Sequence, residues 1–107
     1  MYITTPINAG ESNMFQIWVR QFRYGSGNHG LYYFSGYAYG SGNSLISEEA
    51  TTIDGGASCS FVTDSNNKVV LKINGGCLYY CHYQFDYIGW QSKVEGDFSY
   101  SNTYAGA

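Results

Sequence analysis

Apolar residues recur at every second position over two segments of the chain, which is the period of a β-strand. In residues 14–24 the apolar Phe15, Ile17 and Val19 alternate with Gln16, Trp18 and Arg20. In residues 31–39 both faces carry aromatic side chains. One face carries Leu31, Tyr33, Tyr37 and Tyr39, and the opposite face carries Tyr32 and Phe34. Both segments are predicted to be strands.

Clusters of Gly, Asn, Asp and Ser separate further apolar segments and mark the turns between them. We expect strands over residues 57–63, 68–73, 77–87 and about 94–100, and an exposed, less regular edge segment over 45–53. The strand over 77–87 places Cys77, Tyr79, Cys81, Tyr83, Phe85 and Tyr87 on one side. Six to eight short strands with frequent turns predict an all-β protein, an antiparallel, jelly-roll-like β-sandwich. A single domain is expected over residues 1–107, with its core at about 14–100.

The length and net charge of the chain limit the classes of function and partner that we expect. A chain of 107 residues has room for one modest core. A formal net charge of −3 provides no positive field for phosphate or anionic lipid, so neither nucleic acid nor a membrane is an expected partner. No apolar run approaches the roughly 18 residues that span a bilayer, and no signal peptide is recognisable.

Cysteine and histidine residues raise the question of a metal site. Three cysteines cannot all pair within one chain, so free thiols in a reducing compartment are expected. Cys77, Cys81 and His82 have the residue types of a zinc site. On a strand, however, residues four apart lie about 13 Å from each other, and His82 faces away from Cys81. We therefore expect buried cysteines, no metal and no cofactor.

Catalysis is also disfavoured by spacing. His82 and Asp86 share a face but lie about 13 Å apart, too far for a base and the group that orients it. Glu48-Glu49 fits a solvated edge segment. Cys59 beside His29 or His82 would make a cysteine hydrolase, and the acidic pair a carboxylate hydrolase. These remain the enzymatic alternatives to the expected non-catalytic protein.

The aromatic content is the strongest functional signal. Aromatic residues make up 19% of the chain, with twelve Tyr, six Phe and two Trp, more than one thin sandwich can bury. Several Tyr and at least one Trp should therefore be exposed, as at an interface. A self-assembly surface would centre on Trp18, Tyr33, Tyr37 and Tyr83. A sugar-stacking surface would use Trp18, Tyr32, Tyr33 and Trp90. Both interpretations remain open.

Four segments, taken in order, resemble a known family. They are Met14-Phe15-Gln16-Ile17-Trp18-Val19, then Tyr37-Ala38-Tyr39-Gly40 with Asn43, then Thr63-Asp64 followed by Asn67-Lys68-Val69-Val70-Leu71-Lys72-Ile73, and last Tyr79-Tyr80 leading to Phe85. Together they resemble the terminal β-domains of tailed-bacteriophage tail fibre, tailspike and related virion surface proteins. The resemblance spans residues 14–90.

The resemblance implies a viral structural protein. Such a domain assembles as a homotrimer in the host cytoplasm, is displayed on the virion beside other virion proteins, and binds host-surface glycan as a receptor. It implies no catalytic residues. A fibre tip or surface decoration is thus the expected function, and a stand-alone lectin-like carbohydrate-binding module is the alternative.

Overall fold

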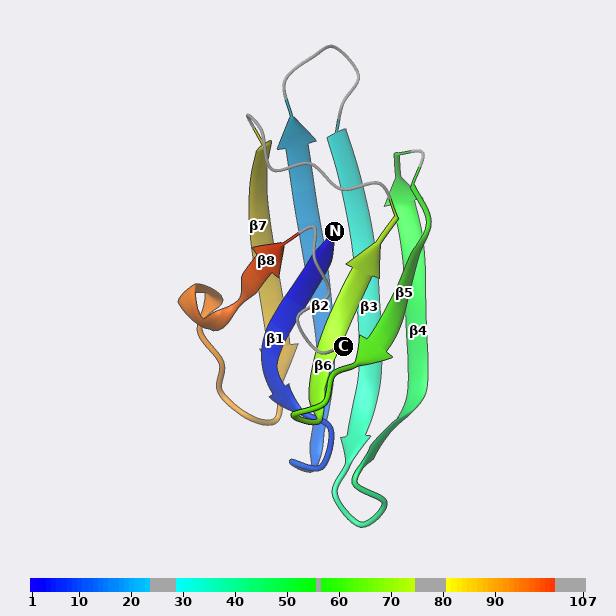
Figure 1. The fold of residues 1–107 in the computed structure, drawn as a ribbon, viewed down its shortest axis with the longest axis vertical. Coiled ribbons are helices and arrows are strands. Elements are labelled where there is room, and N and C mark those ends of the chain that lie inside the picture. The colour runs from blue at the N-terminus through cyan, green and yellow to red at the C-terminus, as the bar shows by residue number, and fades with distance from the viewer. Residues whose placement is uncertain (24–28, 56, 75–80, 102–107) are drawn as a thin grey trace.

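The structure, a computed structural model, describes residues 1–23, 29–55, 57–74 and 81–101. Within these residues the chain forms two four-stranded sheets that pack face to face (Figure 1). Every strand pair is antiparallel. The prediction of an all-β sandwich is confirmed.

The two sheets differ in length. Sheet A has the order β5 (Cys59–Thr63), β6 (Lys68–Ile73), β1 (Tyr2–Asn8) and β8 (Ser99–Ser101). Sheet B has the order β4 (Ser44–Asp54), β3 (His29–Tyr39), β2 (Asn13–Arg23) and β7 (Cys81–Gly89). The strands of sheet B extend beyond those of sheet A at the ends of the molecule (Figure 1). Sheet B therefore offers a long outer face.

The core lies between the sheets and follows the predicted alternation. In β2, Phe15, Ile17 and Val19 are buried while the residues between them are exposed. Phe34 from β3 is fully buried and meets Phe61 of β5 edge to face, with ring centroids 5.4 Å apart. Burial of these apolar side chains on one face of each sheet is what joins the two sheets.

The first strand was not predicted, and the expected start of the core near residue 14 was wrong. β1 lies inside sheet A, between β6 and β8, and its Ile3 and Ile7 are fully buried. Pro6 argues against a central strand because it cannot donate a ladder hydrogen bond. The register with β6 shifts between Thr4 and Asn8, and this irregularity accommodates the proline.

The end of the chain also differs from the expectation of a strand over 94–100. A short 3₁₀ helix, η1 (Glu95–Asp97), comes first, and β8 has only three residues. The Glu95 carboxylate accepts a hydrogen bond of 2.7 Å from the backbone N–H of Phe85. The segment thus covers part of the outer edge of β7, an edge that would otherwise expose unpaired backbone groups.

Three other segments were predicted from the sequence, and the structure describes all or part of each. The exposed segment over 45–53 is the edge strand β4, and its pairing with β3 is interrupted by two irregularities. The hairpin of 57–73 is confirmed as β5 and β6. Part of the strand predicted over 77–87 lies outside the described residues, and its described part begins at Cys81.

Candidate functional site: a groove between aromatic rows

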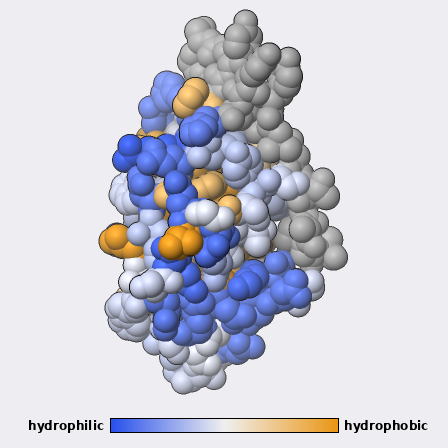
Figure 2. Space-filling model, turned by 90° about the vertical axis from the view of Figure 1, so that its left-hand side faces the viewer, coloured by the Kyte–Doolittle hydropathy of each residue, from blue (hydrophilic) through white to orange (hydrophobic). Residues whose placement is uncertain are grey.

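The outer face of sheet B carries most of the exposed large apolar side chains of the described chain. They are Met14, Trp18, Phe22, Tyr39, Ile46, Ile88 and Trp90. Seen from the side that carries β7 and η1, hydrophobic patches lie among hydrophilic residues (Figure 2). The expectation of exposed aromatic rings is confirmed.

The first aromatic row crosses the sheet at Met14. Tyr37 pairs with Met14 across the strands, and the Trp90 backbone N–H donates to the Met14 carbonyl at 3.1 Å. The rings of Tyr37 and Trp90 lie 5.7 Å apart at 70°. Trp90 is 66% exposed, so its indole is free to contact a ligand.

The second aromatic row crosses the sheet at Trp18. Its ring lies 4.7 Å from that of the opposite residue Tyr33, tilted by 54°. Trp18 follows Met14 by four residues on β2, which separates the rows by about 13 Å. Both Trp18 and Trp90 therefore present ring surface on the same side of sheet B.

A groove of about 490 Å³ lies beside these rows. Its lining is formed by Tyr33, Tyr37 and Trp90, by Met14, Phe15 and Ile88, and by Gln16, Ser35, Gly36, Ser47 and Gly89. Between the rows, Gln16 pairs with Ser35 on β3 and with Ile88 on β7. Ser35 is short where its neighbours Tyr33 and Tyr37 are large, and this difference hollows the surface.

The lining carries hydrogen-bonding groups but no charge. The hydroxyls of Ser35 and Ser47 and the carboxamide of Gln16 can each donate and accept hydrogen bonds. Ser47 has a φ of 53° and sits where the pairing of β4 with β3 shifts. The groove therefore combines aromatic faces with neutral groups of both hydrogen-bonding polarities.

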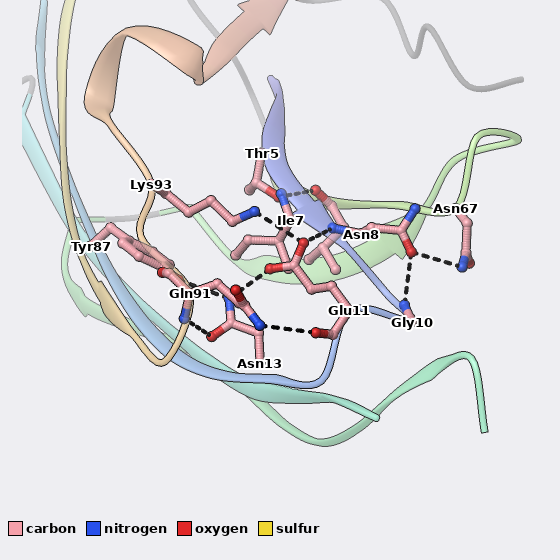
Figure 3. Close-up of polar contacts among 11 residues, drawn as sticks. Thr5, Ile7, Asn8, Gly10, Glu11, Asn13, Asn67, Tyr87, Gln91 and Lys93 are labelled. Carbon is pink, nitrogen blue, oxygen red and sulfur yellow. Dashed lines mark hydrogen bonds and ion pairs between the residues drawn. The ribbon is translucent and has the colours of Figure 1, made fainter. Parts of the chain in front are cut away.

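Hydrogen bonds centred on the Asn13 side chain fix the segment that carries Trp90 (Figure 3). The Asn13 side chain, fully buried, donates to the Glu11 carboxylate at 2.9 Å and to the Tyr87 hydroxyl at 2.8 Å. Its carbonyl oxygen accepts from the Gln91 backbone N–H at 3.1 Å. The Tyr87 hydroxyl in turn donates to the Gln91 carbonyl at 2.6 Å. The residue after Trp90 is thus anchored at both backbone groups.

An ion pair extends this anchor. The Lys93 ammonium lies 3.0 Å from the Glu11 carboxylate, and both side chains are largely shielded from water. The same carboxylate accepts the Asn8 backbone N–H at 2.9 Å. The segment after β7 is therefore tied to the turn between β1 and β2 (Figure 3), which positions Trp90 before any ligand arrives.

A second polar row lies beyond Trp18. Arg20 and Gln84 pair across β2 and β7, and the Arg20 guanidinium lies 3.3 Å from the Asp86 carboxylate. Next along β2, the ring of Phe22 lies 5.7 Å from the His82 imidazole. The outward side chains of β2 thus alternate between polar ones, Gln16 and Arg20, and apolar or aromatic ones, Met14, Trp18 and Phe22.

The residues considered for catalysis do not come together. Cys59 lies in sheet A against the core, where burial raises the pKa of its thiol, and Thr52 donates a hydrogen bond to its sulfur at 3.7 Å. His82 packs on Phe22, on the outer face of sheet B. His29 pairs with Asp54 at 2.9 Å. Neither imidazole faces the Cys59 thiol.

No group of three or more metal-ligating side chains exists among the residues that the structure describes. Cys77 lies outside those residues, and the Cys81 side chain is likewise not described. Over the same part of the chain, no helix has the length and apolar character that crossing a membrane requires.

Two of the predicted site residues are buried. Tyr32, a predicted stacking residue, is 2% exposed because its face of β3 packs against sheet A. Tyr83, a predicted interface residue, is 6% exposed, and its hydroxyl accepts a hydrogen bond from the Gln21 side chain. Neither offers surface to a ligand or a partner. Both predictions are wrong.

Four predicted site residues do lie on the outer face of sheet B. They are Trp18, Tyr33, Tyr37 and Trp90. Sequence reasoning missed the polar and aliphatic part of the groove, which is formed by Met14, Gln16, Ser35, Ser47 and Ile88. The alternation of β2 and β3 places Gln16 and Ser35 on the faces of Trp18 and Tyr33, so a known strand register would have identified them.

A scan against protein-family models and searches of curated proteins and of solved structures found no match to this chain.

Proposed function

We propose that the protein is a non-catalytic carbohydrate-binding module, and that the groove on the outer face of sheet B holds a neutral sugar. The observation that carries the proposal is that an exposed, anchored Trp90 lines the same groove as two uncharged polar side chains, Gln16 and Ser35. This combination suits a pyranose, whose ring face is lined by C–H groups and whose rim is lined by hydroxyls.

The two kinds of group in the groove have separate roles. The Trp90 and Tyr37 rings offer apolar, polarisable faces against which the C–H groups of a sugar pack. The Gln16 carboxamide and the Ser35 hydroxyl match sugar hydroxyls, which also both donate and accept. The aromatic faces contribute affinity, and the polar groups select the orientation of the ring.

Charge favours a neutral ligand over an anionic one. No charged side chain lines the groove, and the chain has a formal net charge of −3. A sialylated or sulfated glycan would be repelled by the overall field and would find no cation in the groove. A neutral hexose or pentose chain meets no such penalty.

A glycan array with neutral and acidic members, followed by isothermal titration of the best binder, tests the proposal. Trp90→Ala removes the exposed ring. If a sugar covers about 60 Å² of that ring, the loss is about 1.5 kcal/mol, or about tenfold in Kd. Ser35→Phe, which fills the hollow without removing a ring, should abolish binding.

The control is Val94→Ala, which removes an exposed apolar side chain outside the groove and should leave Kd unchanged. An array without any neutral binder would contradict the proposal. The same holds if Trp90→Ala binds the glycan as tightly as the wild-type protein.

Self-assembly, expected from the sequence, is the second candidate. It is favoured by the exposure of Phe22 and Ile88 on the same face, since large exposed apolar side chains often mark an interface. The homotrimer and the virion setting rest on the resemblance alone. Native mass spectrometry tests the homotrimer, because a monomer at micromolar concentration would argue against assembly while leaving sugar binding possible.

A further inference from the structure

We infer that the site takes an extended glycan chain, laid along β2 across more than one aromatic row, and not a single sugar. This inference rests on the proposed function, since it assigns further sugar-binding positions on the same face. It is carried by the repeat of aromatic and polar rows beyond the groove.

The repeat follows the four-residue spacing of the outward side chains of β2. Met14, Trp18 and Phe22 each anchor an aromatic or apolar row, and Gln16 and Arg20 occupy the positions between them. At about 3.3 Å per residue, neighbouring rows lie about 13 Å apart and the full set spans about 26 Å. One sugar ring is too small to touch two of these rows at once.

Each aromatic row has its own exposed ring. Trp90 is 66%, Trp18 is 36% and Phe22 is 61% exposed. The rings of the first two rows contact an aromatic partner that supports them from the next strand or segment, Tyr37 for Trp90 and Tyr33 for Trp18. Because supported rings lose little side-chain freedom when a ligand binds, the entropic cost of binding is lower.

The row between Trp18 and Phe22 has the groups of a second sugar-binding position. The Arg20 guanidinium of this row lies 3.3 Å from the carboxylate of Asp86, which pairs with Trp18 in the row before, and both side chains are substantially exposed. Together with the Gln84 amide they offer charged donors and acceptors side by side. Neighbouring sugar hydroxyls can bond to a donor and an acceptor placed in this way.

Ring orientation indicates which form of glycan is bound. The ring planes within the three rows are inclined to each other by 70°, 54° and 41°. A flat crystalline polysaccharide surface would need rings in a common plane. Because the two rings of each row do not share a plane, no row forms a flat platform by itself, and a single soluble chain is the expected form of the glycan.

An extended, proline-rich peptide is the alternative ligand, because such peptides also bind aromatic grooves. The polar rows favour the glycan. Taken together, their side chains provide both donors and acceptors, whereas a proline-rich peptide offers mainly carbonyl acceptors.

The test is a titration series of linear β-linked gluco-, galacto- and manno-oligosaccharides, each from disaccharide to hexasaccharide. In the best series, affinity should rise by about tenfold or more between disaccharide and hexasaccharide. Trp18→Ala and Phe22→Ala should each remove part of this gain, and Phe22→Ala, which changes a residue outside the groove lining, should leave the disaccharide Kd unchanged. Phe22 is highly exposed, so its replacement is not expected to disturb folding.

The outcomes separate the two proposals. If the hexasaccharide binds no more tightly than the disaccharide, or if Trp18→Ala and Phe22→Ala leave the gain intact, the extended site is overturned and the sugar-binding groove stands. If no oligosaccharide of any length binds, or if a proline-rich peptide binds instead in a Trp90-dependent way, both proposals fail.

Discussion

Removing the Asn13 side chain should destabilise the protein, because three hydrogen bonds depend on this fully buried side chain. Asn13→Ala deletes the bonds to the Glu11 carboxylate, the Tyr87 hydroxyl and the Gln91 backbone N–H. Neutral hydrogen bonds contribute about 0.5–1.5 kcal/mol each and one to a charged group about 1.5–3 kcal/mol. Water can replace the lost hydrogen bond to the exposed Gln91, so we expect the free energy of unfolding to fall by about 3 kcal/mol, near the lower end of the sum.

Urea denaturation followed by far-UV circular dichroism measures this loss. With a slope of about 1.5 kcal/mol per molar urea, the midpoint should fall by about 2 M. The matched control is Asn66→Ala, which changes an exposed turn residue and should shift the free energy of unfolding by less than about 0.5 kcal/mol.

The same variant also tests the link between the anchor and the site. Because Asn13 holds the backbone of Gln91, its loss should release Trp90 and weaken sugar binding even where the protein is fully folded. If Asn13→Ala and Asn66→Ala have equal midpoints, the buried network contributes nothing to stability and the reasoning is refuted.

Three further predictions concern the core, an edge and a thiol. Phe34→Ala should lower the free energy of unfolding by about 3–5 kcal/mol in the same urea assay, since Phe34 is fully buried against Phe61. A smaller loss than that of Asn13→Ala would contradict it. Glu95→Ala should lower the free energy of unfolding by about 1 kcal/mol and increase light scattering on heating, because it frees the Phe85 N–H on the edge of β7. Unchanged scattering would show that the edge is protected by other means. Burial raises the pKa of the Cys59 thiol above its ordinary value of 9.0. The neutral thiol therefore contributes to the stability of the folded state below pH 9.0, and this contribution is lost as the pH rises through the raised pKa. Iodoacetamide at about pH 8 should accordingly label Cys59 more slowly in the native protein than in urea, as read by peptide mapping; equal rates would refute the burial argument.

Alternation along the chain was sufficient to predict the two central strands of sheet B, β2 and β3. Residues 14–24 and 31–39 were placed in strands from their period alone, and they form the centre of that sheet. The choice between the two faces of β3 was harder, because aromatic residues occupy both. Tyr32 and Tyr33 are equivalent in sequence terms. Only the packing of sheet A decides that Tyr32 is buried and Tyr33 is not.

The unpredicted parts depend on contacts between distant segments. β1 is stabilised by pairing with β6 and β8. Its Pro6 makes the segment unlike a central strand when only the neighbouring sequence is considered. The anchor of Trp90 joins Asn13 to Gln91, 78 positions apart in the sequence. The row of Gln16, Ser35 and Ile88 needs the register of three strands. No local pattern encodes such pairings.

The central claim is that Trp90 contacts a sugar in the groove, and nuclear magnetic resonance tests it most directly. The chain has two tryptophans, so a ¹⁵N–¹H spectrum contains two indole N–H signals, which Trp90→Phe and Trp18→Phe assign. On titration with the best neutral oligosaccharide from the array, the Trp90 signal should shift and saturate at the Kd measured by calorimetry. A titration that binds the sugar but leaves the Trp90 signal in place would contradict the account.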